Sequence, residues 1–390
     1  MDERDLIVRR FVEIFGGSAA DVRVFHAPGR VNLIGEHIDY NGGRVFPAAL
    51  TFGTTMAVRR RGDRKLRLAS ANFELRGEAD LDRLAFDPAD GWMNYPKGVA
   101  FHLMRHGYAI DGCDMLFDGR IPNGAGLSSS ASIEVVTGYG LLALSGHSVD
   151  TVRLALIAQE AENRFVGVSC GIMDQFASAN GKRDHAVLLK CDTLEYRHVP
   201  FRGGSYKIVI GNTGVRRELA GSEYNVRRSQ CEEAVRHLQA AFPDLKLLCE
   251  LTPEAYFEHE HLIPDETLRK RARHAVGENA RVLEAVNVLE QNDLAAFGKL
   301  MTDSHRSLQT LYEVTGKELD AMVEAALAAP GVLGSRMTGA GFGGCTVSLV
   351  HEDHVADFIR RVGDAYKTAV GLDAVFYVCG IGDGVREVQG

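Results

Sequence analysis

The 390-residue sequence predicts an α+β protein with two domains. Its length exceeds that of a typical single domain, and a hydrophobic content of 45% is ample for large cores. Strand-like and helix-like segments are mixed in both halves of the chain. A short glycine-bearing break at 201–204 marks a boundary, so we expect an N-terminal domain of residues 1–200 and a C-terminal domain of residues 201–390.

Hydrophobic periodicity predicts the elements in chain order. Residues 113–118 alternate as a strand, residues 121–127 form a turn-rich loop, and a helix begins at Ser128. A second helix places apolar side chains on one face from Leu154 to Phe165. The remaining expected elements are buried strands at 186–189 and 206–210, helices over 265–330, and strands at 344–350 and 375–379.

Charge and cysteine content argue against several classes of protein. The formal net charge of -8 gives no electrostatic attraction to nucleic acid or to an anionic membrane, so we expect neither partner. The N-terminus lacks the apolar core of a signal peptide, and no apolar run approaches the length of a membrane span. Seven scattered cysteines without a Cys-x-x-Cys pair indicate reduced thiols. We therefore expect a cytoplasmic protein that is a monomer, with an oligomer left open.

The strongest chemical signal is the glycine- and serine-rich stretch 121–132, which reads IPNGAGLSSSAS. A strand is expected before it and a helix after it. Glycines let the backbone approach a ligand, and the N–H groups at a helix start attract phosphate oxygens. The stretch is not a Walker P-loop, because it has no Gly-Lys-[Ser/Thr]. A loop with serine N-caps is the alternative. The candidate nucleotide-binding residues are Gly124, Ala125, Gly126, Leu127, Ser128, Ser129 and Ser130.

A second glycine-rich stretch at 337–344 formally contains G-x-G-x-x-G. A dinucleotide-binding interpretation fails, because that motif must be followed by a helix and a strand is expected here. A protein-kinase interpretation fails as well, because the chain has neither His-Arg-Asp nor Asp-Phe-Gly. A tight turn between two elements remains the alternative to a ligand-binding loop.

Polar residues crowd between glycines at 27–43, amid the apolar Val31, Leu33 and Ile34. Carboxylates, an imidazole and a guanidinium suit a polyhydroxylated ligand, whose adjacent hydroxyls need both acceptors and donors. A metal site is less well supported, because no second histidine lies at a helical spacing. A surface loop is the remaining alternative, although so many convergent polar groups favour a pocket. The candidate residues are Arg30, Glu36, His37, Asp39 and Asn41.

Together these stretches resemble the GHMP small-molecule kinases, and within them the galactokinase family. Residues 29–41 are similar to the galactokinase signature, residues 126–131 to the family's phosphate loop, and residues 338–344 to its third motif. Residues 170–176 resemble the segment that carries its catalytic aspartate. The stretches 222–228 and 304–308 also fit. All of these motifs occur in order over most of the chain, which makes the resemblance specific.

The resemblance implies a fold and an activity. The fold would be the two-domain GHMP kinase fold, with a ribosomal S5 domain 2-like N-terminal domain, a ferredoxin-like C-terminal domain and the site between them. The activity would be transfer of the γ-phosphate of ATP to the anomeric hydroxyl of galactose, with Mg²⁺ as the cofactor. Two alternatives stay open: a related kinase acting on N-acetylgalactosamine or arabinose, and a non-catalytic galactose sensor.

The resemblance also implies roles for individual residues. Asp174 would be the base or orienter of the reacting hydroxyl, and Arg30 would stabilise Asp174 and the transferred phosphoryl group. Mg²⁺ would be held by Ser130 and Glu162, although Glu162 could instead be a solvated helix residue. Trp92 would lie near the adenine or else be a structural aromatic residue. The residues expected to hold sugar hydroxyls are Glu36, His37, Asp39, Gly171 and Tyr224.

Overall fold

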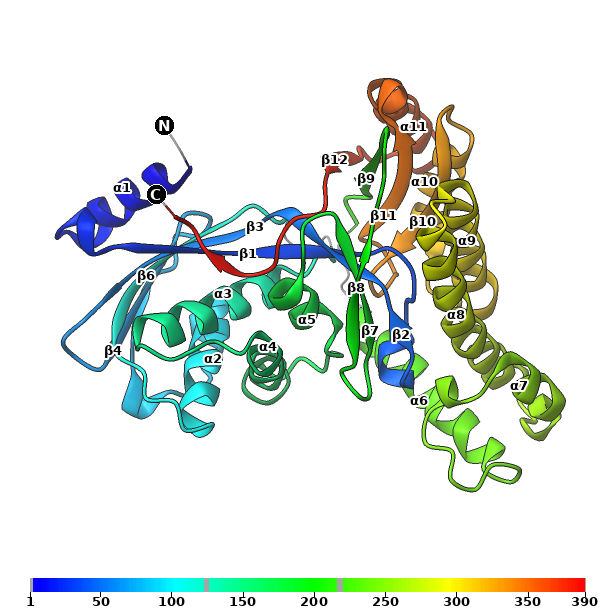
Figure 1. Ribbon diagram of the computed structural model, residues 1–390, viewed down its shortest axis with the longest axis horizontal. Helices are drawn as coiled ribbons and strands as arrows, with labels where there is room; N and C mark the ends of the chain where they lie inside the picture. The colour runs from blue at the N-terminus through cyan, green and yellow to red at the C-terminus, as the bar shows by residue number, and fades with distance from the viewer. Residues whose placement is uncertain (1–2, 123–125, 216–219, 390) are drawn as a thin grey trace.

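The computed structural model describes residues 3–122, 126–215 and 220–389 and contains three β-sheets. In Figure 1 the first of the two larger sheets lies in the left half of the view, the second stands to the upper right of centre beside α9 to α11, and the small sheet lies below the second. This mixture of mainly antiparallel sheets and packed helices confirms the α+β prediction. Within the described residues, no helix combines the length and the apolar content that crossing a membrane requires.

The first sheet has six strands in the order β13-β1-β3-β6-β4-β5, and only the β4–β6 pair is parallel. Alternating residues of its long strands enter two different cores. Val24 packs with Phe11 of helix α1, whereas its neighbour Phe25 faces the main core on the other side. Helices α3 and α5 cover that other side (Figure 1). The strands are β1 (Arg23–Asn32), β3 (Pro47–Arg60), β4 (Lys65–Ser70), β5 (Gly77–Asp80), β6 (Cys113–Gly119) and β13 (Arg386–Glu387).

The second large sheet is fully antiparallel, in the order β10-β11-β9-β12. Helices α10 and α11 bury one face of it through side chains such as Met322 and Phe358, which pack with Val209 of the sheet. Helix α9 approaches strand β10 where Gly298 meets Gly334, and a Cβ at either position would collide with the other backbone. The strands are β9 (Tyr206–Asn212), β10 (Val332–Thr338), β11 (Cys345–His351) and β12 (Val375–Cys379).

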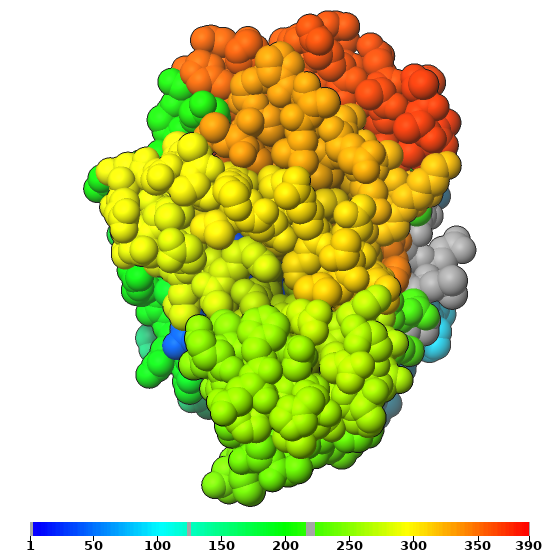
Figure 2. All heavy atoms as spheres, turned by 90° about the vertical axis from the view of Figure 1, so that its right-hand side faces the viewer, coloured from blue at the N-terminus to red at the C-terminus, as the bar shows by residue number. Residues whose placement is uncertain are grey.

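The third sheet, β2-β7-β8, is small and lies beside the long helix α8. Its strands are β2 (Arg44–Val45), β7 (His185–Lys190) and β8 (Tyr196–Pro200). Helices α6 to α9 form the middle and lower part of the face seen in Figure 2, and later residues, in orange, form its top. The helices are α1 (Glu3–Phe15), α2 (Asn94–Arg105), α3 (Ser129–Leu144), α4 (Thr151–Glu160), α5 (Met173–Asn180), α6 (Ala220–Leu238), α7 (Pro253–His259), α8 (Glu266–Glu290), α9 (Leu294–Ser307), α10 (Gly316–Leu327) and α11 (Val355–Val370).

The elements expected from periodicity are present, with two informative differences. The helix expected from Leu154 to Phe165 is regular only to Glu160, and residues Ala161–Val166 form a wider π-helical turn. The polar stretch at 27–43 is not a loop throughout, because β1 continues to Asn32. The division at residue 200 stays a prediction. Strand β9 begins the second sheet soon after it, but β13 near the chain end pairs with the first sheet.

Candidate active site

Arg30 and Asp174 form a two-pronged ion pair, as their predicted partnership requires. Arg30 lies on β1 and Asp174 in the first turn of α5. Arg30 Nε donates to Asp174 Oδ1 and Nη2 donates to Oδ2, both at 2.9 Å. The Arg30 side chain is 5% exposed, whereas that of Asp174 is 29% exposed. The buried Arg30 guanidinium therefore holds the Asp174 carboxylate on its inner side, and the other side of the carboxylate is accessible.

Ser128 connects this ion pair to the phosphate loop. Its backbone is left-handed, with φ 64°, which is uncommon for a residue that has a side chain. Its hydroxyl does not cap helix α3 but donates to Asp174 Oδ2 at 2.6 Å. Arg30 Nη1 also donates to the carbonyl of Gly126 at 2.7 Å. The strained backbone thus places a hydroxyl against the candidate base, as strain at functional sites commonly does.

Glu36 is nearly buried and is held through one oxygen. Its Oε1 accepts hydrogen bonds from the Gly339 N–H at 2.7 Å and from the Thr338 hydroxyl at 3.2 Å. The Arg336 guanidinium lies 3.5 Å from the same oxygen. Among the described residues, none donates a hydrogen bond to Oε2. The glycine-rich stretch at 337–344 is therefore a turn that binds this carboxylate and leaves its second oxygen available to a ligand.

Asp39 and Gly171 are in contact, and the contact depends on the glycine. A Cβ at position 171 would collide with the Asp39 carboxylate. Burial, and secondly the nearby charge of Asp174, together raise the pKa of Asp39 to about 6. The structure thus brings together the carboxylates of Asp39 and Asp174, with Gly171 beside them.

His37 lies in a cluster of tyrosines and already has protein partners at both ring nitrogens. Its Nε2 donates to the carbonyl of Ala340 at 3.0 Å, since a carbonyl can only accept. In the neutral ring Nδ1 then accepts from the Tyr40 hydroxyl at 2.8 Å. The ring of Tyr224 lies 5.4 Å from that of His37, centre to centre. A sugar hydroxyl bonded to His37 must displace one of these partners, so that predicted role stays a prediction. Asn41 donates to the carbonyl of His37 and so stabilises the turn.

Ser130 and Glu162 meet at the start of α3. The π-helical turn after α4 directs Glu162 inward, where its side chain is buried and hydrogen-bonded to the Ser130 hydroxyl. Burial raises the pKa of Glu162, and the Ser130 hydrogen bond opposes that rise. Gln175 Nε2 also donates to Glu162 Oε2 at 2.6 Å. The solvated-helix alternative for Glu162 is therefore wrong.

These hard oxygen atoms suit Mg²⁺, which takes one or two protein oxygens and completes its shell with waters and phosphate. The described residues contain no group of three His, Cys, Asp or Glu side chains placed to hold a metal ion. A site that depends on substrate phosphate does not require such a group.

A cavity of about 210 Å³ adjoins the phosphate loop. Four of its lining residues are aromatic, and two of these, Trp92 and Phe73, are stacked with ring centres 6.3 Å apart. The Trp92 Nε1 donates to the carbonyl of Leu75 at 3.2 Å, so this edge of the indole is already bonded. The lining residues are Thr54, Ser70, Asn72, Phe73, Trp92, Tyr95, Phe117, Gly119, Ile121, Ser129, Ser130 and Ile133. Gly124 and Ala125, which we expected at this loop, lie outside the described residues.

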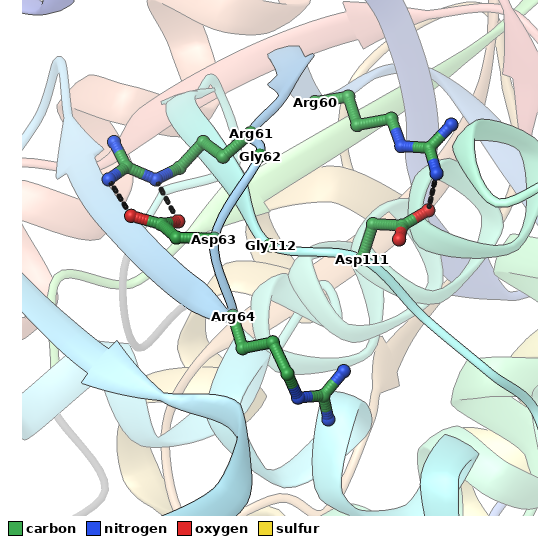
Figure 3. Close-up of a pocket in the computed structure, with 7 residues that line it drawn as sticks. All are labelled: Arg60, Arg61, Gly62, Asp63, Arg64, Asp111 and Gly112. Atoms are coloured by element: carbon green, nitrogen blue, oxygen red, sulfur yellow. Dashed lines mark hydrogen bonds and ion pairs between the residues drawn. The ribbon is translucent and has the colours of Figure 1, made fainter.

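A cavity of about 620 Å³ at the turn between β3 and β4 has no connection with this site (Figure 3). It lies at the far end of β3, roughly 35 Å along the strand from the position paired with Arg30. Arg60 pairs with Asp111 and Arg61 with Asp63 at its rim, and Arg64 points away from both pairs. Arg64 pairs with Asp82 instead, so each of the three guanidinium groups already has a protein carboxylate as partner.

Three family models match the chain. They are the galactokinase galactose-binding signature over residues 9–60, the GHMP kinases N-terminal domain over residues 94–182 and the GHMP kinases C-terminal domain over residues 283–368. A galactokinase of Fusobacterium nucleatum is 53% identical over 98% of this chain and 99% of its own length. A galactokinase of Bacillus subtilis is 49% identical over 97% and 98% of the two chains.

Solved structures agree with these matches. A Lactococcus lactis galactokinase complexed with galactose is 45% identical, with a TM-score of 0.95 over 98% of this chain and 99% of the other. A mevalonate kinase at 18% identity has a TM-score of 0.67 over 92% and 98% of the two chains, which speaks for the fold alone. The expected two-domain GHMP kinase fold is thereby confirmed.

Proposed function

The chain belongs to the galactokinase family of GHMP kinases, and we propose that Arg30, Asp174 and Glu36 form the centre of its active site. The enzyme is an ATP-dependent sugar kinase that transfers the γ-phosphate of ATP to the anomeric hydroxyl of galactose, giving galactose 1-phosphate and ADP. The observation that carries the residue assignment is the two-pronged Arg30–Asp174 pair beside the phosphate loop.

In the proposed mechanism Asp174 binds the anomeric hydroxyl and accepts its proton as the bond to phosphorus forms. The exposed side of the carboxylate is the side that meets the sugar. Arg30 and the Ser128 hydroxyl hold both oxygens of Asp174, so the carboxylate cannot rotate away from the hydroxyl. Phosphoryl transfer asks mainly for positioning and charge stabilisation, and Arg30 contributes both.

Galactose recognition is assigned to the carboxylates deeper in the site. Glu36 Oε2 and the Asp39 carboxylate are acceptors for neighbouring sugar hydroxyls, and Gly171 leaves room for the sugar beside Asp39. Tyr224 and His37 supply an aromatic wall. An epimer with one hydroxyl turned away leaves a buried acceptor without its donor, which costs about 1–3 kcal/mol.

The nucleotide is assigned to the α3 end of the site. Backbone N–H groups at the start of α3 bind the phosphates, and the aromatic cavity beside Trp92 accepts the adenine. Ser130 and Glu162 would hold Mg²⁺, which would neutralise phosphate charge during the transfer. The enzyme is proposed to act in the cytoplasm as a monomer. Seven free thiols support the reducing compartment, and light scattering would measure the mass.

A coupled assay of ADP release over a panel of sugars tests this function. Galactose should be the preferred substrate, and glucose, its 4-epimer, should be used at least tenfold less efficiently by the ratio of kcat/KM values. If the enzyme prefers N-acetylgalactosamine or arabinose, that sugar replaces galactose as the assigned substrate. If the protein binds galactose but phosphorylates none of the sugars, the result would favour the alternative of a non-catalytic galactose sensor.

A further inference from the structure

We propose that helices α8 and α9 position the sugar-binding Glu36, and that His274, Glu278, Ser304 and Ser307 thereby set the affinity for galactose. These four residues are called the α8–α9 support below. The inference rests on the proposed role of Glu36. It assigns a function to the stretch 304–308, which the family resemblance includes but to which the site described above gives no role.

Glu278 binds the main chain immediately before Glu36. Its Oε1 accepts hydrogen bonds from the Gly35 N–H at 2.9 Å and from the Ser304 hydroxyl at 2.6 Å. Its Oε2 pairs with Arg281. Burial alone would raise the pKa of Glu278, but the charges of Arg281 and Arg336 outweigh it and hold the pKa at about 2. Glu278 is therefore an ionised acceptor whose oxygens all have partners.

His274 binds the main chain immediately after the Glu36 Cα. Its Nε2 donates to the Glu36 carbonyl at 3.2 Å, and its Nδ1 accepts from the Ser307 hydroxyl at 2.8 Å. Burial lowers the pKa of His274 to about 4, so the ring is neutral at pH 7. A neutral ring has one donor and one acceptor, and both are used here.

The spacing of the four residues explains how α8 and α9 together can bind the main chain at Gly35 and Glu36. His274 and Glu278 are four residues apart on α8, and Ser304 and Ser307 are three apart on α9, so each pair lies on one helical face. Each serine fixes one of the α8 side chains. None of the four is more than 7% exposed. Gly35 has φ 99°, a conformation that suits glycine, and this bend allows both contacts.

The consequence is that Glu36 is held at three points. Its main chain is bound on both sides by α8, and its Oε1 is bound by Gly339. Only Oε2 is left for the sugar, and its direction depends on all three contacts. The α8–α9 support contacts neither Asp174 nor the aromatic cavity of the nucleotide. Its loss should therefore weaken galactose binding and leave the chemical step and ATP binding nearly unchanged.

The test is a set of serine variants measured in the full-length enzyme. Ser304→Ala and Ser307→Ala each remove one hydroxyl that orients an α8 side chain. We expect each to raise the KM for galactose about threefold and the double variant to raise it about tenfold. The kcat and the KM for ATP should stay within twofold of the parent. Ser307→Thr restores a hydroxyl and should recover most of the loss.

Ser348→Ala is the matched control. Ser348 is 1% exposed, lies in the same half of the chain, and shares a buried hydrogen bond with Ser335 at 2.8 Å. It contacts neither Gly35 nor Glu36 in the described structure. We expect its KM for galactose to stay within 1.5-fold of the parent. A direct measurement of galactose binding by calorimetry, and a thermal unfolding curve for each variant, accompany the kinetics.

The outcomes distinguish failure of the proposed galactokinase function from failure of the positioning role of the α8–α9 support. A parent enzyme that does not phosphorylate galactose defeats the proposed function. A parent that does so, with both single variants within 1.5-fold of its galactose KM, overturns the positioning role alone. Equal losses in kcat and in both KM values would also overturn it, because they indicate a general structural effect. If the double variant does not fold, the two single variants decide the question.

Discussion

Asp174 and Glu36 are the two carboxylates at the centre of the proposed active site, yet the protein holds them in different ways. Asp174 is held by side chains of its own half of the chain, Arg30 and Ser128, and its carboxylate is partly exposed. Glu36 is held by residues of the other half, among them Gly339 and Glu278, and is 2% exposed. One carboxylate is thus supported locally and the other across the junction of the two halves.

The two kinds of support correspond to the two proposed roles: Asp174 takes part in the reaction, and Glu36 recognises the sugar. The hydrogen bonds that join the proposed base to the phosphate loop all lie within one half of the chain. The sugar carboxylate takes its position from helices and a turn far away in the sequence. Substitutions around Asp174 should therefore change kcat, and substitutions around Glu36 and Asp39 should change the KM for galactose.

The largest expected effect tests Asp174, the carboxylate that is supported within its own half of the chain. Asp174→Asn keeps the shape of the side chain but removes the proton acceptor, so kcat should fall by about two to four orders of magnitude. ATP binding, measured by calorimetry, should be nearly unchanged because Asp174 does not line the aromatic cavity. A kcat within tenfold of the parent would remove Asp174 from the mechanism as a base.

The next effect tests the recognition region. Asp39→Ala removes a half-buried carboxylate that is the proposed acceptor of a sugar hydroxyl, so the KM for galactose should rise roughly tenfold to a hundredfold, with little change in the KM for ATP. The ratio of kcat/KM for galactose over glucose should fall in the variant. A parent ratio near one would contradict the galactose assignment and leave the sugar-kinase assignment in place.

A smaller effect concerns the proposed metal site of Ser130 and Glu162, which lies in the same half of the chain as Asp174. Ser130→Ala removes a candidate oxygen ligand beside Glu162, so the Mg²⁺ concentration at half-maximal rate should rise about fivefold. The measurement is a Mg²⁺ titration of the initial rate, supported by Mn²⁺ binding without turnover. An unchanged midpoint in both would mean that the hydroxyl only bonds Glu162.

The smallest effect is a pH dependence that belongs to recognition alone. The pKa of Asp39 is raised to about 6, so the group is ionised above this pH and protonated below it. If the ionised form accepts the sugar hydroxyl, the KM for galactose rises as pH falls through 6, by about fourfold at pH 5.5. The Asp39→Asn variant should lack this dependence. A parent KM that is flat from pH 5.5 to 7.5 would contradict the assignment.

Much of the fold and the site could be predicted because the signals are local. Strand and helix periodicity identified the elements that flank the phosphate loop, such as β6 and α3. The polar stretch at 27–43 and the segment around Asp174 drew attention by composition and by resemblance. The structure then brings Arg30 to Asp174 and Ser130 to Glu162, as the implied roles require.

The remainder depends on contacts that no local pattern contains. Nothing in the serine run indicates that Ser128 adopts a left-handed backbone and bonds Asp174. A regular helix is expected at Glu162, but the structure has a π-helical turn there, in which the Glu162 side chain is buried. Tyr95 and Phe73 line the cavity beside Trp92. Tyr95 could have been found, because it lies in the same short aromatic segment as Trp92, whereas Phe73 gave no such signal.

Strand β13 gives the order of synthesis a role in folding. It pairs with β1 at the edge of the first sheet, and Arg23 bonds Glu387 across 364 positions of sequence. A ribosome makes β13 more than 350 residues after β1, so this edge of β1 is without its partner strand while those residues are made. Unpaired strand edges recruit other chains. Chaperone demand and the yield of active enzyme should thus be sensitive to substitutions that break the β1–β13 pairing, such as substitutions of Arg23 or Glu387.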